Sequence, residues 1–236
     1  MAAIQTIINR CNGMTINRRK VVGQQMTRNQ IPRVSTTPTK NPWTMELDMP
    51  TSFRYNDARV LMESVDTLDR TGYEDVTFSN NPALSWIYRY QGTLPLSQLS
   101  PITVSSFVGD QLVLTNLPAI ASTRVMFEPN DLIQIGTFPY PFTSTTQVTR
   151  GTGATVAVTT HRPNILSNPS LLVPPPWEGV NIIVGNACTF RMFCPNMPVY
   201  KLIVGGAQYS AGGTLLGNAL IEWSDPFQLY EYVGTS

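Results

Sequence analysis

The stretch that decides the fold covers residues 127–163 and reads FEPNDLIQIGTFPYPFTSTTQVTRGTGATVAVTTHRP. Its first apolar run, 131–136, is rich in β-branched residues and too short for a helix, so it predicts a strand. Two more strands are predicted over 142–149 and 154–160, joined by a hairpin turn at 150–153, because glycine readily adopts the positive φ that a tight reversal needs. The last run alternates apolar residues with Thr and Ala, which predicts protein on both of its faces. We expect this three-strand unit to act as scaffold.

The clearest single strand is predicted at 43–49. One face carries four apolar residues and the other carries polar ones, namely Trp43, Met45, Leu47 and Met49 against Thr44, Glu46 and Asp48. Strict alternation of this kind is typical of a half-buried strand. Further strand-like segments recur at 75–78, 84–91, 102–107, 111–114, 123–127, 179–185, 188–194, 200–204, 220–223 and 227–233, with a hairpin turn at 107–110.

A helix is predicted over 57–68, with Asn56 as its N-cap. Its apolar residues have helical spacing and form one stripe, consisting of Ala58, Leu61, Val65 and Leu68. The proline-rich segment 164–178 is predicted to be a stiff connector, since successive prolines cannot join a sheet interior. Because strands outnumber helices, the sequence predicts a mainly β fold, an antiparallel β-sandwich or barrel with one flanking α-helix.

The composition favours a protein that works in an assembly. Of the 236 residues, 42% are hydrophobic and only 13% are charged, whereas a typical soluble domain has about 25% charged residues. Interface cores are depleted in charge, so much of the surface can be covered by neighbouring copies or partners. The alternative is a β protein whose surface is made mainly of Thr, Ser and Asn.

The charges are distributed unevenly along the chain. Residues 1–40 carry no acid and seven basic residues, which gives +7, and residues 41–236 carry nine basic and fifteen acidic residues, which gives −6. We expect an extended basic arm over 1–40, ordered by contacts outside its own core, on a β domain over 41–236; terminal disorder is the alternative. A basic arm suits a like copy, an acidic partner or nucleic acid. Protein contacts are favoured, with Arg18, Arg19 and Lys20 as candidates.

The three cysteines are Cys11, Cys188 and Cys194. An odd number in a chain of this length argues against a disulfide framework and fits buried thiols in a reducing cytoplasm. The first residues lack the apolar core of a secretory signal, and no run reaches the roughly 20 apolar residues of a membrane span. We therefore expect a soluble protein with no membrane contact, made without export.

Grouped catalytic residues are missing from the sequence. His161 is the only histidine, and no Gly-x-Ser-x-Gly elbow is present to supply a serine nucleophile. We expect His161 to end a strand as a hydrogen-bonded loop residue. The glycine pair at 151 and 153 is not followed by a helix, so it lacks the setting for phosphate binding. A Cys₃His zinc site stays open, although paired CxxC spacings are absent. The sequence predicts a non-enzyme with no cofactor.

Three segments resemble a module of bacteriophage tail proteins: NDLIQIG at 130–136, VTRGTG at 148–153, and VAV at 156–158 followed by HRP at 161–163. In that module a Gly-Asp-hydrophobic-Ile-Gln-hydrophobic-Gly strand leads to a glycine-containing hairpin and to a strand that ends near Pro-hydrophobic-Arg. This chain departs from it at two points, because Asn130 replaces the usual glycine and the ending is reordered. The 43–49 strand and the helix ending at Arg70 also look like the start of tail-tube and tail-hub ring subunits.

The resemblance implies a structural subunit of a phage tail tube, hub or baseplate, in the virion and assembled in the host cytoplasm. Such subunits form a closed ring, often six-fold, around the DNA channel and contact adjacent tail proteins. The 127–163 unit would then be an inserted β-hairpin unit in a tail-tube-type β domain. Its tip, with Arg150 and Thr152, becomes the place to look for a partner, and the basic arm would reach a neighbouring copy or ring.

Two other classes of function stay open in the sequence. The first is a receptor- or carbohydrate-binding β module of a virion, for which Trp177, Tyr209, Trp223 and Tyr230 are the candidate exposed aromatics. The second is a hydrolase that uses His161. Glycan binding would favour the first, and turnover that is lost in His161→Ala would favour the second.

Overall fold

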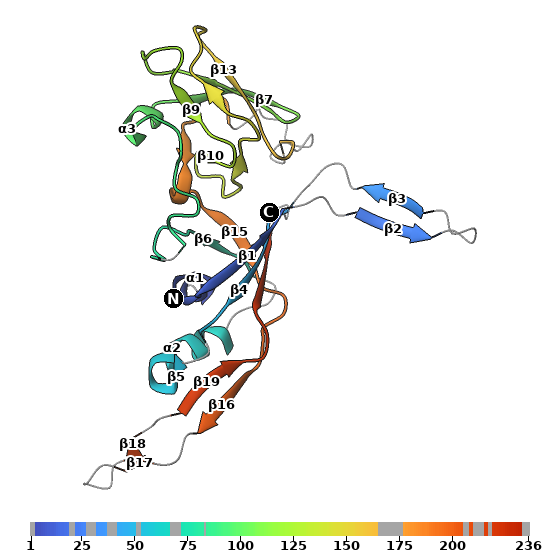
Figure 1. The fold of residues 1–236 in the computed structure, drawn as a ribbon, viewed down its shortest axis with the longest axis vertical. Coiled ribbons are helices and arrows are strands. Elements are labelled where there is room, and N and C mark those ends of the chain that lie inside the picture. Colours follow the sequence, from blue (N-terminus) through green and yellow to red (C-terminus); the bar gives the residue numbers. More distant parts are fainter. Residues whose placement is uncertain are drawn as a thin grey trace. The chain divides into compact units, whose positions relative to one another are not determined.

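The computed structural model describes residues 3–18, 22–26, 32–36, 42–50, 53–66, 72–82, 84–164, 177–204, 208–209, 215–216 and 219–232. The chain divides into two compact units (Figure 1). Unit 1 consists of Met1–Asn17, Pro42–Ala83 and Arg191–Ser236, and unit 2 consists of Arg18–Asn41 and Leu84–Phe190. Strands dominate both units and their pairings are antiparallel, so the prediction of a mainly β, antiparallel fold is confirmed.

Unit 1 is built on a five-stranded sheet. Its strands lie in the order β1 (Gly13–Asn17), β4 (Thr44–Asp48), β20 (Phe227–Glu231), β15 (Phe190–Phe193) and β6 (Glu74–Val76). The predicted alternation of the 43–49 strand is confirmed, because Met45 and Leu47 are buried while Glu46 and Asp48 are exposed. The same alternation in β20 buries Phe227 and Leu229 on the core face.

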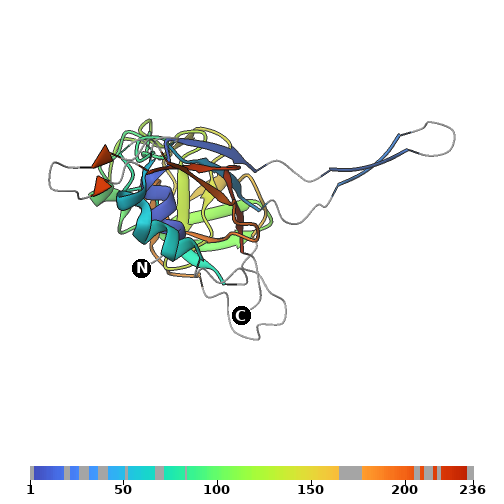
Figure 2. The same cartoon turned by 90° about the horizontal axis from the view of Figure 1, so that it is seen from below.

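The helix α1 (Ala3–Arg10) covers the core of unit 1 and corrects the prediction of an arm over residues 1–40. Ile4, Ile7 and Ile8 are fully buried, and β1 pairs with β4 along its whole length. Residues 3–17 are therefore part of the folded core and not an extended arm. Figure 2 shows α1 and α2 side by side, in agreement with their contacts.

The N-terminus of α1 is capped from a distant part of the chain. The Glu74 carboxylate accepts hydrogen bonds from the backbone N–H groups of Ala3 and Ile4, both at 2.8 Å. Helix N-termini carry unsatisfied N–H groups and a partial positive charge, which a carboxylate satisfies. The Gln5 side chain adds two hydrogen bonds to the backbone of Thr77.

A second sheet of unit 1 packs on the predicted helix. This helix, α2 (Tyr55–Asp66), buries Ala58, Leu61 and Met62, so the helix and its apolar stripe are confirmed where the side chains are described. Asn56 lies inside the helix, which begins at Tyr55, and the prediction that Asn56 is the N-cap is wrong. The sheet has the order β16 (Tyr200–Val204), β19 (Ala219–Trp223) and β5 (Phe53–Arg54), beside the short pair β17 (Gln208–Tyr209) and β18 (Leu215–Leu216).

Unit 2 contains short strands around one core. The sheets are β13–β8–β7, β11–β10–β14 and the pair β12–β9, with bounds β7 (Thr103–Val108), β8 (Gln111–Thr115), β9 (Val125–Phe127), β10 (Leu132–Ile135), β11 (Phe142–Thr143), β12 (Val148–Thr149), β13 (Val156–Thr159) and β14 (Ile182–Val184). Short helices occur at α3 (Leu96–Leu99) and η1 (Gly185–Ala187). Side chains from these sheets share a single hydrophobic cluster.

The stretch 127–163 is not one three-strand unit. The first predicted strand is confirmed as β10, but 142–149 forms the two separate strands β11 and β12, and β13 pairs with β8 instead of closing a hairpin with 142–149. The three segments therefore contribute to three sheets. The prediction that β13 has protein on both faces is wrong, since Ala157 is exposed; it is β10 that is buried on both faces.

Among the other strand predictions, the exception is 84–91. This segment forms turns, closed by backbone hydrogen bonds from Ile87 to Leu84 and from Arg89 to Trp86. The hairpin at 107–110 is confirmed, because Val108 pairs with Gln111 across a turn in which Gly109 has φ +59°. The basic residues 19–41 contain the hairpin of β2 (Val22–Met26) and β3 (Pro32–Thr36). Most of the predicted proline-rich connector, 165–176, lies outside the described residues.

Candidate assembly surfaces

The predicted contact residue Arg18 is used inside the chain. Its guanidinium donates hydrogen bonds to the side-chain oxygens of Thr143 and Asn130, both in unit 2. Arg18 itself belongs to unit 2, so its guanidinium is engaged inside that unit. Arg19 and Lys20 lie outside the described residues.

Arg150 also has a structural role. Its guanidinium donates to the carbonyl oxygens of Pro118 at 2.9 Å and Gly153 at 2.7 Å. These bonds fold the 150–153 turn back on itself, and Gly151 supplies the positive φ of +60° that was predicted there. Thr152 is exposed at the tip of the turn. Of the two predicted contact residues in this turn, Thr152 is thus the more accessible one.

The 130–136 segment depends on special backbone geometry. Asn130 has φ +74° and Gly136 has φ +50°, a left-handed region that asparagine tolerates better than other residues with a Cβ. A Cβ on Gly136 would lie 2.5 Å from a Val180 methyl group. Between them, the buried Asp131 accepts the backbone N–H groups of Glu128 and Gln91, each at 2.8 Å. Burial raises the pKa of Asp131 in spite of these bonds.

His161 is held as the sequence predicted, by hydrogen bonds at the end of a strand. Its Nδ1 accepts the backbone N–H of Thr143 at 2.9 Å, and the backbone N–H of His161 donates to the Thr143 carbonyl at 3.0 Å. Burial, reinforced by the nearby Arg162 and Arg18 charges, lowers the pKa of His161 to about 3. The imidazole is therefore neutral near pH 7. Arg162 is buried beside it, with its guanidinium over the Phe142 ring.

The three cysteines are buried thiols and form no disulfide. Burial raises the pKa of the Cys11 thiol to about 11 and raises that of Cys188 further, which makes both poor nucleophiles because the thiolate is the reactive form. Within the described ranges, no group of three or more His, Cys, Asp or Glu side chains is placed to hold a metal ion.

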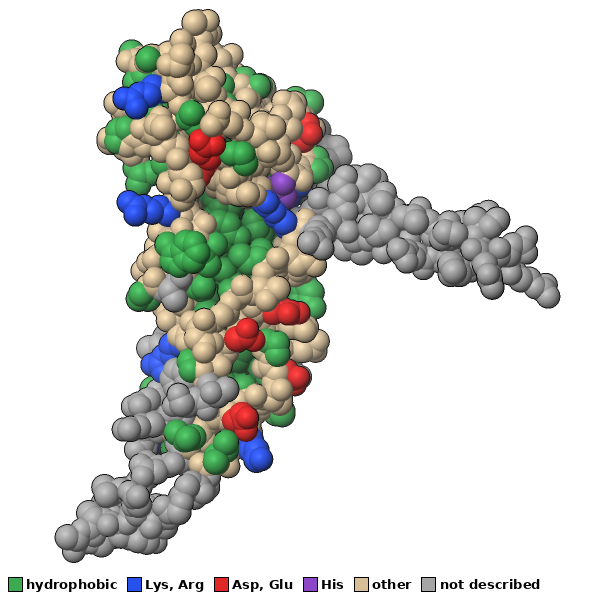
Figure 3. All heavy atoms as spheres, viewed as in Figure 1, with side chains coloured by type: hydrophobic (Ala, Val, Ile, Leu, Met, Phe, Trp, Pro, Cys, Tyr) green, Lys and Arg blue, Asp and Glu red, His purple; other side chains and the backbone are tan. Residues whose placement is uncertain are grey.

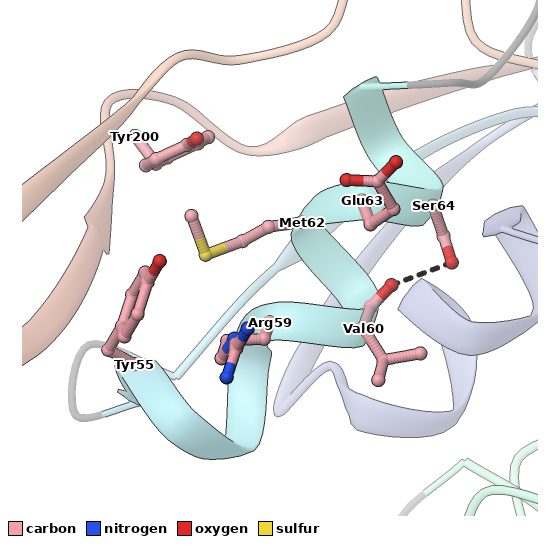
Figure 4. A pocket seen from close by; sticks show the side chains of 7 residues that line it. All are labelled: Tyr55, Arg59, Val60, Met62, Glu63, Ser64 and Tyr200. Carbon is pink, nitrogen blue, oxygen red and sulfur yellow. Dashed lines mark hydrogen bonds between the residues drawn. The ribbon is translucent and has the colours of Figure 1, made fainter.

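The exposed apolar residues of unit 1 concentrate on two neighbouring elements. Five of the ten exposed large hydrophobic residues found among the described residues lie on α2, on β16 or next to them: Tyr55 (36% exposed), Val60 (56%), Val199 (73%), Leu202 (44%) and Ile203 (39%). Leu202 lies on the α2 side of β16, and with Tyr55 and Val60 it forms what we call the α2–β16 surface, whereas Ile203 lies on the opposite face of the strand. A hollow of about 510 Å³ lies between α2 and β16. There the Met62 side chain points toward the rings of Tyr55 and Tyr200 (Figure 4).

Sequence reasoning missed this surface for an identifiable reason. The run VYKLIV at 199–204 is apolar at five of six positions, which is the pattern of a strand buried on both faces. In the structure β16 is the last strand of its sheet, so Leu202 and Ile203 stay partly exposed. The face drawn in Figure 3 carries few charged side chains over β7, β9, β10 and β13.

The aromatic residues considered for glycan binding are mostly covered. Trp177 is buried, and Trp223 is half-buried between Tyr200 and Phe227. Tyr230 is half-buried near Phe193. Tyr209 lies in a strand whose side chains are outside the described residues. No observation on these residues favours a carbohydrate site.

No protein-family model matches this chain, and no curated protein sequence matches it. No helix in the part of the chain that the structure describes is long and apolar enough to cross a membrane.

Proposed function

We propose that the chain is a structural subunit of a bacteriophage tail, in the tube, the hub or the baseplate, that assembles into a closed ring. The observation that carries the proposal is the motif likeness over 130–163 together with its backbone. The family motif has glycine where this chain has Asn130, and Asn130 adopts the left-handed φ that such a glycine would provide. The substitution therefore fits the motif instead of breaking it.

The distribution of surface chemistry supports an assembly role. The chain is poor in charge, and half of the exposed large apolar side chains found among the described residues lie on or beside α2 and β16; exposed apolar patches mark proteins that bury surface against a partner. Heterologous contacts that repeat from copy to copy close into a ring when the rotation allows it. A β-sandwich of the tail-tube type is part of this proposal, and the single core shared by the sheets of unit 2 supports it.

The contact role expected for the basic arm is now proposed for residues 19–41 alone. Residues 19–41 carry five basic residues and no acid, a charge of +5, in a segment that leaves the paired strands β1 and β4. We expect this β2–β3 segment, and not the whole of residues 1–40, to reach an acidic neighbouring copy, an adjacent ring or other tail proteins. DNA in the channel would be contacted without sequence specificity.

The test is electron microscopy of the purified full chain and of a variant in which residues 19–41 are replaced by Gly-Gly. We predict negatively stained rings for the full chain, and rings that stack less for the variant. Particles that remain single globular subunits would contradict the ring. Rings that stack equally well in both proteins would contradict the role of the basic segment alone.

A further inference from the structure

Among the described residues, two edge strands of unit 1 have the same length. β16 has β19 as its paired neighbour and β1 has β4, and each edge strand has five residues. An open strand edge presents a row of backbone N–H and C=O groups that another strand can pair with, and proteins usually protect such edges. Among the described residues, the edge of β16 carries a single charge, that of Lys201, and β1 carries none.

The apolar faces of the two strands match. On β16, Tyr200 and Leu202 lie on the face covered by α2, because Leu202 pairs with the buried Ile221. On β1, Met14 and Ile16 lie on the core face, opposite Leu47 and Met45. Met14 and Ile16 are only half-buried, because among the described residues β1 has a paired strand, β4, on one side alone. If β1 were added beside β16, the two apolar faces would form one continuous row.

The charges favour a second copy of the chain as the occupant. On the α2 side, the α2–β16 surface is rimmed by Arg59 and Glu63, which are both exposed and whose charges sum to zero, so it has no attraction for nucleic acid. When the apolar faces are aligned, Lys201 lies on the same side as Thr15, whose paired neighbour is the exposed Glu46. Opposite charges then lie on one face of the joined sheet.

We infer that β1 of one copy adds to the β16 edge of the next copy and places Met14 and Ile16 against the α2–β16 surface. The inference rests on the proposed ring function and specifies its contact. Strand addition of this kind takes affinity from backbone hydrogen bonds and specificity from alternate side chains. The two edges differ and belong to different sheets, so the contact is head-to-tail and each copy keeps one edge available for a further neighbour.

The experiment uses two variants of the full chain that block one edge each. Leu202→Lys blocks β16 and Ile16→Lys blocks β1, because an ammonium group that is solvated in the monomer would be buried by pairing, while its stem still covers apolar surface. Val108→Lys is the matched control, since Val108 is 76% exposed in the β7–β8 hairpin. Circular dichroism and thermal unfolding identify any variant that fails to fold.

Sedimentation velocity of each protein, and of an equimolar mixture of the two blocked variants, gives the readout. We predict oligomers for the wild type and for Val108→Lys, at least a tenfold weaker association for each blocked variant, and heterodimers in the mixture. The heterodimer follows because Ile16→Lys keeps its β16 edge and Leu202→Lys keeps its β1 edge.

Three outcomes would overturn the inference. The first is that Leu202→Lys forms oligomers as stable as those of the wild type. The second is that Ile16→Lys self-associates normally, which would indicate that β16 pairs with β16, and the third is that the mixture of folded variants stays monomeric. In each of these cases a wild type that still oligomerises leaves the proposed ring standing. A wild type that is monomeric throughout contradicts the proposed function itself. If Ile16→Lys does not fold, Met14→Lys, at the other half-buried apolar position on the same face of β1, replaces it in the same mixture.

Discussion

At the scale of single residues, Glu74 joins two parts of the chain that are about seventy positions apart. Its carboxylate binds the first N–H groups of α1, so the helix and the β6 edge of the five-stranded sheet stabilise one another. No local sequence pattern announces this cap, because helix N-caps are ordinarily found next to the helix they serve.

We predict that Glu74→Ala lowers the free energy of unfolding by about 1–2 kcal/mol, since it removes the cap and leaves N–H groups of α1 without their acceptor. Urea unfolding followed by circular dichroism measures the change. Glu178→Ala is the control, because Glu178 is exposed and lies in unit 2. Equal stabilities of the two variants would show that the cap contributes nothing.

His161 gives the protein a specific dependence of stability on pH. Its pKa is about 3 in the folded chain against an ordinary value of 6.5, so below pH 6.5 the unfolded chain binds a proton that the folded chain does not. Stability therefore falls as the pH drops from about 6.5 toward 3, by up to about 1.4 kcal/mol per pH unit.

The variant His161→Asn tests this dependence, because an amide oxygen can accept the Thr143 N–H without titrating. Chemical unfolding between pH 4 and pH 7 should show a smaller loss of stability in the variant than in the wild type. His161 is the only histidine, so the difference between the two slopes reports on this residue. Parallel slopes would contradict the buried, neutral imidazole.

At the scale of elements, α1 shows what the sequence could and could not reveal. Ile4, Ile7 and Ile8 have the i, i+3, i+4 spacing of an amphipathic helix, but the helix has eight residues and its cap is Glu74, so nothing nearby marks its start. The surrounding basic residues favoured an arm. In contrast, β4 was predictable because the seven residues 43–49 that contain it alternate strictly.

The prediction that residues 127–163 form one three-strand unit is wrong for a different reason. Local patterns located β10 and β13 but merged β11 and β12 into one strand, and the pairing of β13 with β8 joins residues that are more than forty positions apart. Local turn chemistry favours a hairpin with the nearest strand, whereas tertiary packing decides the partner. Of the predicted contact residues, Arg18 and Arg150 could be recognised as basic, but their intramolecular acceptors could not.

We expect the stability of the chain to depend strongly on α1 and only weakly on the β2–β3 segment. Ile7→Ala should destabilise the chain by about 2–5 kcal/mol, because it removes a fully buried side chain and leaves a cavity. Replacement of residues 19–41 by Gly-Gly should change the stability by much less, since Asn17 and Thr44 are already paired neighbours. Thermal unfolding of both variants tests this. A greater loss of stability in the variant that lacks residues 19–41 than in Ile7→Ala would contradict this expectation.

At the scale of the whole molecule, three features bear on the proposed ring. These are the edges of β1 and β16, which have no second paired strand among the described residues, the α2–β16 surface and the basic segment 19–41. A stable monomer gains nothing from an unprotected edge strand with exposed apolar side chains, which favours unwanted pairing. A subunit that buries these features against neighbouring copies in a closed ring is protected from such pairing.

Native mass spectrometry of the purified full chain shows whether the chain forms the closed ring that we propose. We predict one dominant species whose mass is a fixed multiple of the 26.1 kDa chain, with six copies as the expected number, across a range of protein concentrations. A ring should show no open-ended ladder of intermediate sizes, because closure satisfies every interface. A monomer that persists up to the highest soluble concentration would contradict the account.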